Sequence, residues 1–133
     1  MKIMKAVLRW LPCVLLMGVI FAFSSFPSSS LPDYGSWDTL VKKAGHMAGY
    51  GMLAVALWYP LGWRRNAWLP ALLLAVAYAL GDEFHQSFVP GRHASWVDAL
   101  VIDPAGALLG LACAAGLRRG RQRPRPPRDI LPG

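Results

Sequence analysis

Charged side chains are scarce in this sequence: they make up 16% of its 133 residues, and only seven of them are Asp or Glu. Hydrophobic residues make up 55%, and they are concentrated in four blocks at 7–23, 44–63, 67–81 and 96–117 that have almost no polar face. A helix on the surface of a soluble protein needs such a face. A transmembrane helix instead needs about 20 mostly apolar residues. The sequence therefore predicts an all-α membrane protein with four transmembrane helices.

Two further shortages limit the partners that we expect. The chain has only two cysteines, Cys13 and Cys113, and both lie inside apolar blocks, so a disulfide framework is not indicated. The basic, proline-rich segment 118–133 has no aromatic residues that would stack on bases. It directly follows an apolar block, which favours contact with anionic lipid headgroups over nucleic-acid binding. We divide the chain into a membrane domain at 1–117 and a basic tail at 118–133.

The basic residues predict the orientation of the four helices. Positive charge is enriched in the cytoplasmic segments of membrane proteins. Most Lys and Arg residues lie before the first block, between the second and third blocks, and in the tail, whereas the other side receives only Lys42, Lys43 and Arg92. Both termini are therefore predicted to be cytoplasmic. The first block also resembles a signal peptide, but its length favours a retained anchor.

Acidic residues gather where the third block ends. Residues 67–81 form about 22 Å of helix, which is shorter than a bilayer core of about 30 Å. The helix is therefore expected to continue through the sequence DEFHQ. This places Asp82 and Glu83 at the outer edge of the membrane, with Gln86 on the same face as Asp82 at the spacing i, i+4.

Other polar residues reach the same outer boundary from the neighbouring helices. Lys43 and His46 are expected in the first outer turn of the second helix, with Tyr50 one turn deeper on the same side. Arg92 follows a Pro-Gly turn, and Asp98 lies near a helix start for which Ser95 is the expected N-cap. The sequence thus predicts a polar cluster at the extracytoplasmic end of the bundle.

Three kinds of function fit this cluster. Arg92 and Lys43 suit the phosphate or carboxylate of a lipid headgroup or lipid-linked glycan. A membrane-embedded hydrolase or transferase is the alternative, with Glu83 or Asp82 as general base and His46 as acid. In a purely structural alternative, Arg92 pairs with a neighbouring acid and locks the bundle. The catalytic candidates are Glu83, Asp82 and His46, and the ligand-binding candidates from this reasoning are Arg92, Gln86, Lys43, Tyr50 and Asp98.

A metal site receives less support from the sequence. The motif HExxH is absent, and a site made of His46, Glu83 and His85 is disfavoured because His85 points away from Glu83 on their helix. We therefore expect neither a metal nor another cofactor. Asp103 lies about 7.5 Å deeper than Asp98 along the last helix, and Gly106 and Gly110 form a small-residue face for helix packing there.

Four sequence segments together resemble the VanZ-like family of small membrane proteins. The matching segments are FSS at 23–25, KKAGHMAGY at 42–50, DEFHQSFVPGRHASWVDAL at 82–100 and DPAGALLG at 103–110. The string DExxQ…PGR…D is the specific part of this resemblance, which adds Ser24 to the ligand-binding candidates. Family members commonly have asparagine where this chain has Asp103.

The resemblance implies a multi-pass protein of the bacterial inner membrane and cell envelope. The founding member of the family is associated with resistance to the glycopeptide antibiotic teicoplanin. Many relatives occur without a resistance cluster, so a general envelope role is the expectation here. The expected partners are membrane lipids or lipid-linked envelope intermediates.

Overall fold

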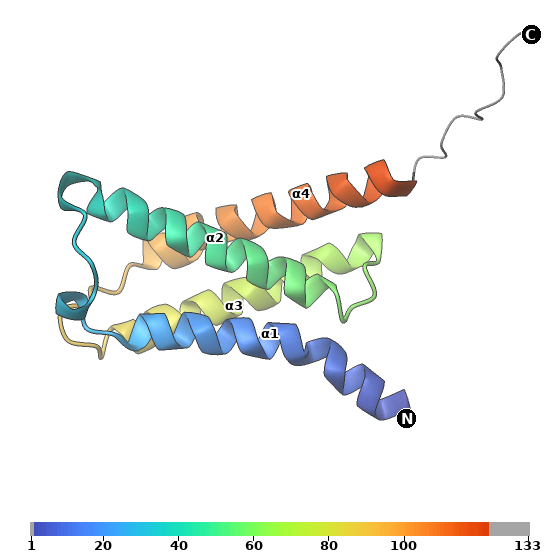
Figure 1. Ribbon diagram of the computed structural model, residues 1–133, viewed down its shortest axis with the longest axis horizontal. Coiled ribbons are helices and arrows are strands. Elements are labelled where there is room, and N and C mark those ends of the chain that lie inside the picture. The colour runs from blue at the N-terminus through green and yellow to red at the C-terminus, as the bar shows by residue number, and fades with distance from the viewer. Residues whose placement is uncertain (1, 123–133) are drawn as a thin grey trace, which may run out of the picture.

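The computed structural model describes residues 2–122, and all the regular secondary structure in this part of the chain is helical, without strands. Figure 1 shows a bundle of four long helices: α1 (Lys2–Ser25), α2 (Asp38–Trp58), α3 (Trp68–Gln86) and α4 (Asp103–Gln122). A π-helical segment, η4 (Asp98–Ile102), leads directly into α4. The all-α prediction is confirmed. Residues 118–122 of the predicted tail continue α4, and its remainder lies outside the described residues.

The extension of the third helix through DEFHQ is confirmed, because α3 ends at Gln86. The predicted bounds of the second helix are wrong at both ends. It begins at Asp38, whose carboxylate is favourable at a helix N-terminus, and it ends before Pro60, whose ring would clash with the preceding turn. Lys43 and His46 therefore lie in the second and third turns of α2, not in the first.

Helices α2 and α4 approach each other more closely than an ordinary side chain would permit. A Cβ atom at Gly106 would overlap backbone atoms of Met47, and one at Gly110 would overlap backbone atoms of Gly51. A Cβ at Gly51 itself would lie 2.9 Å from the carbonyl oxygen of Gly106. The predicted small-residue face is thus a contact between helix backbones, which fixes α4 against α2.

Three segments within the described residues are long and apolar enough to cross a membrane: Ile3–Ser25, Arg65–Gln86 and Asp98–Arg121. Most side chains of these segments are exposed on the bundle, as expected for helices that contact lipid. Helix α2 does not reach the same mean hydropathy. It carries two lysines, a histidine and several glycines among its 21 residues.

One end of the bundle collects the polar segments. Figure 1 shows that α1 ends, α2 begins, α3 ends and η4 lies at the same end, opposite the end that holds the N-terminus. The residues DEFHQ of α3, the KKAGH segment of α2 and Asp98 are therefore neighbours in space. We call this end the polar pole.

Candidate functional site

The polar pole contains every buried polar or charged residue of the described chain. Ser24 comes from α1, Asp82, Glu83 and Gln86 come from α3, and Asp103 begins α4; none of these residues is more than 4% exposed. Five buried polar residues from three helices require partners, because an unpaired polar group buried away from water is costly. Their arrangement separates them into two groups, one around Asp82 and one around Asp103.

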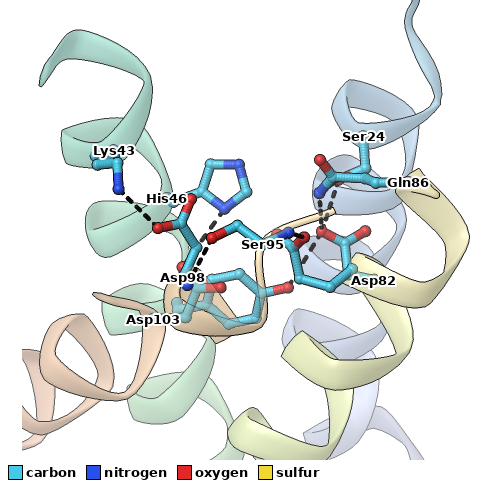
Figure 2. Close-up of polar contacts among 10 residues, drawn as sticks. Ser24, Lys43, His46, Asp82, Gln86, Ser95, Asp98 and Asp103 are labelled. Carbon is cyan, nitrogen blue, oxygen red and sulfur yellow. Dashed lines mark hydrogen bonds and ion pairs between the residues drawn. The ribbon is translucent and has the colours of Figure 1, made fainter. Parts of the chain in front are cut away.

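Asp82 is the centre of the first group (Figure 2). Its Oδ2 atom accepts hydrogen bonds from Ser24 Oγ at 2.7 Å, from Gln86 Nε2 at 2.9 Å and from the Tyr50 hydroxyl at 3.3 Å. The Gln86 amide also donates to Ser24 Oγ at 3.4 Å. The donors come from α1, α2 and α3, so this carboxylate joins three helices. The four residues, all predicted from the sequence, are brought together.

Glu83 lies on the adjacent face of α3 and holds the loop that precedes η4. Its Oε2 atom accepts a hydrogen bond of 2.7 Å from the backbone N–H of Ser95. Ser95 Oγ in turn accepts a hydrogen bond of 3.2 Å from the backbone N–H of Asp98, as expected of a capping serine. The buried carboxylate of Glu83 thereby positions the start of the last helical segment.

His46 and Asp103 face each other between α2 and α4 (Figure 2). His46 Nδ1 lies 3.4 Å from Asp103 Oδ1, but the two atoms are not aligned as a hydrogen bond. One ligand-type atom each from His46, Glu83 and Asp103 lies within 4.8 Å of the other two. We call these residues the His46–Glu83–Asp103 cluster. Asp103 was not among the predicted site residues, although its depth in the last apolar block was a signal for it.

The two predicted binding cations are already engaged. Lys43 Nζ lies 2.8 Å from Asp98 Oδ1, and this ion pair joins α2 to η4. Arg92 donates from Nε to the carbonyl oxygen of Phe26 at 3.1 Å and from a terminal nitrogen to that of Phe23 at 2.8 Å. These carbonyls lie at the end of α1, where a helix leaves backbone oxygens without partners.

The pairing assumed by the structural alternative, of Arg92 with Asp82, Glu83 or Asp98, is therefore wrong. Arg92 instead joins the segment after α3 to the end of α1. Within residues 2–122 Arg92 makes no ion pair, and its guanidinium binds backbone carbonyls. His85 is also separate from the cluster. Its Nε2 atom lies 3.0 Å from Ser25 Oγ, and its ring packs on Phe21 with the ring centroids 4.4 Å apart.

A cavity of about 470 Å³ lies beside the polar pole, between α1, α2 and the loop that joins them. Its wall is mostly apolar and includes Val19, Ile20 and Met52. Its polar lining residues are Ser24, Tyr34, Lys42, His46, Tyr50 and Arg92. A larger cavity of about 790 Å³, between α1, α2 and α4, is lined almost entirely by apolar side chains and lacks the acids of the pole.

A family model described as VanZ/LLP1 matches residues 9–118, which include α2, α3, most of α1 and α4, and the entire polar pole. A comparison with curated proteins and another with solved structures each gave no match. The matched range contains the buried network of Asp82 as well as the close contact of α2 with α4. The chain thus belongs to the VanZ/LLP1 family.

Proposed function

We propose that this protein is a multi-pass protein of the bacterial inner membrane whose polar pole binds the headgroup of a phosphate-bearing envelope lipid or lipid-linked intermediate. The observation that carries the proposal is the cavity between α1 and α2. It combines an apolar wall, suited to a hydrocarbon chain, with polar residues suited to a headgroup. A lipid consists of the same two parts, a hydrocarbon chain and a polar headgroup.

The way α2 connects its neighbours supports four crossings of the membrane. Helix α1 ends at the polar pole, and α3 begins at the opposite end, so α2 runs the whole length between them (Figure 1). Its 21 residues correspond to about 31 Å, close to the thickness of the bilayer core. Its charged residues lie in the turns nearest the pole. The buried residues of α2 all lie in the part of the helix from Tyr50 onward.

The basic residues at the opposite end support an outward orientation of the pole. Arg64 and Arg65 lie in the connection from α2 to α3, and Arg118, Arg119 and Arg121 lie near the end of α4. The N-terminal basic residues are at that same end of the bundle (Figure 1). Positive charge is enriched on the cytoplasmic side, so the cavity and the pole face the periplasmic side.

Arg92 is the residue suited to the headgroup phosphate. Its guanidinium has five N–H donors, of which two bind the carbonyls at the end of α1. The remaining donors belong to a half-buried side chain that lines the cavity. Because the backbone contacts already fix the guanidinium, little side-chain entropy is lost when it binds an anion.

Gly45 permits a direct test of the cavity. It lines the cavity, and a Cβ atom at this position meets no atom within 4 Å, so Gly45→Leu fills the space without disturbing the backbone. Gly81 on α3 has equally open surroundings and lies outside both cavities, so Gly81→Leu is the matched control. Native mass spectrometry of protein purified from membranes is expected to show bound phospholipid or lipid-linked phosphate.

We expect this bound lipid to be lost in Gly45→Leu and retained in Gly81→Leu. Wild-type protein that carries no lipid, or a Gly45→Leu variant that carries as much as wild type, would contradict the proposal.

A further inference from the structure

Three side chains with metal-binding atoms converge at the centre of the polar pole. His46 comes from α2, Glu83 from α3 and Asp103 from α4, and one nitrogen or oxygen of each lies within 4.8 Å of the others. The three helices are held in place independently of these side chains, by the glycine contact between α2 and α4 and by the hydrogen bonds to Asp82. The cluster is therefore a preorganised arrangement, not a chance approach of flexible surface groups.

Asp103 supplies an independent observation. Its side chain is 1% exposed, and within the described chain neither of its carboxylate oxygens has a hydrogen-bond partner. The Nδ1 atom of His46 faces it at 3.4 Å and likewise makes no hydrogen bond. Ligand atoms around one tetrahedral cation, with bonds of about 2.0–2.1 Å, lie about 3.3 Å apart. The spacing of His46 and Asp103 would allow both residues to bind one ion.

The charges point the same way. Glu83 and Asp103 are two acids that are 2% and 1% exposed, and within residues 2–122 neither has a Lys or Arg within 4.0 Å. Burying two carboxylates in a medium of low dielectric without a compensating cation is strongly unfavourable. A protonated His46 would balance one of them, whereas a divalent cation balances both.

We propose that His46, Glu83 and Asp103 bind one divalent transition-metal ion, with Zn²⁺ as the best fit. An imidazole nitrogen with two carboxylates is a ligand set that Zn²⁺ accepts, whereas Mg²⁺ and Ca²⁺ prefer oxygen ligands throughout. The hydrogen bond from the Ser95 backbone to Glu83 orients one ligand, as partners of ligands commonly do. Three protein ligands leave a coordination position open on zinc. The inference does not depend on lipid binding.

The test uses the full chain, purified in detergent without a polyhistidine tag and stripped of metal with a chelator. Isothermal titration with Zn²⁺ is expected to give one ion per chain, and Co²⁺ is expected to develop the visible absorption of a tetrahedral complex. Asp103→Asn and Glu83→Gln should each weaken Zn²⁺ binding by at least about tenfold, since even the partners of metal ligands have effects of that size.

Asp38→Asn is the matched control, because it removes an acid near the pole that pairs with Lys42, not with the cluster. It should bind Zn²⁺ as wild type does. Failure of the wild type to bind Zn²⁺ or Co²⁺ would overturn the inference and leave His46 and Asp103 as an ion pair. Equal affinity in Asp103→Asn, Glu83→Gln and wild type would overturn it as well. If either variant folds poorly, the titration of the wild-type protein still decides whether the metal binds.

Discussion

Ser24, near the end of α1, donates a hydrogen bond of 2.7 Å to Asp82 on α3, although the two residues are 58 positions apart in the chain. This bond is buried, and its acceptor also receives donors from α2 and α3. It is therefore one of the few side-chain hydrogen bonds that connect α1 to the rest of the bundle. The first prediction concerns this bond.

Ser24→Ala should destabilise the protein by about 1.5–3 kcal/mol, the range for a hydrogen bond to a charged group. The reason is that Asp82 loses one of the donors to its buried Oδ2 atom. Ser87→Ala is the control, because the exposed Ser87 hydroxyl bonds only the carbonyl of Phe84 in its own helix. Thermal unfolding in detergent measures both variants, and an equal loss of stability would argue against a special role for Ser24.

Gly106→Ala should destabilise the contact of α2 with α4. The new methyl group would overlap the backbone of Met47, and overpacking of this kind costs about 1–3 kcal/mol. Gly116→Ala on the same helix places its methyl group in open space, so it should stabilise the helix by about 0.5–1 kcal/mol. Denaturant unfolding of the two variants should move in opposite directions; a shift of both in the same direction would contradict the described packing.

Arg92→Lys should loosen the end of α1 although it keeps the charge. A lysine has one nitrogen and cannot reproduce the fork that binds the carbonyls of Phe23 and Phe26. Hydrogen exchange measured by mass spectrometry should therefore become faster in the peptide that contains the end of α1. His93→Ala changes the exposed neighbouring residue and serves as the control. Unchanged exchange in Arg92→Lys would show that charge alone is sufficient.

Ser36→Cys should react with a membrane-impermeant maleimide in intact spheroplasts, whereas Asn66→Cys should react only after the membrane is permeabilised. Both positions are exposed and lie in short 3₁₀ segments at opposite ends of the bundle. The two native cysteines, Cys13 and Cys113, would first be replaced by alanine. The opposite labelling pattern would reverse the proposed orientation. If both positions were labelled from the same side, α2, which lies between them, would not cross the membrane.

The lengths and positions of the apolar blocks were sufficient to predict an all-α protein made of long helices. The shortness of the block at 67–81 was sufficient to predict that α3 continues to Gln86 and brings Asp82 to the pole. The start of α2 was missed because residues 38–43 include three charged side chains, and apolar content alone does not show where a helix begins. Its end was missed because the apolar run continues through Pro60.

The residues of the polar pole were easier to predict than the partners that each of them contacts. Opposite charge suggested an acid as the partner of Arg92, but its guanidinium instead binds two backbone carbonyls at the end of α1. Such backbone acceptors leave no mark in a sequence pattern. Asp103 was underrated for a similar reason. Its significance depends on facing His46 across two helices, which is a property of the packed bundle and not of either segment.

The wide turn of η4 also determines the angular position of the two acids at its ends. A π-helical turn is an α-helix that holds one extra residue, and each helical residue corresponds to a rotation of about 100°. If the same residues were wound as an ordinary α-helix, the five steps from Asp98 to Asp103 would swing Asp98 about a quarter of a circle relative to Asp103. The contacts of Lys43 with Asp98 and of His46 with Asp103 would then no longer form together. The π-helical turn thus sets the spacing at which Lys43 and His46, on successive turns of α2, contact Asp98 and Asp103 at the same time.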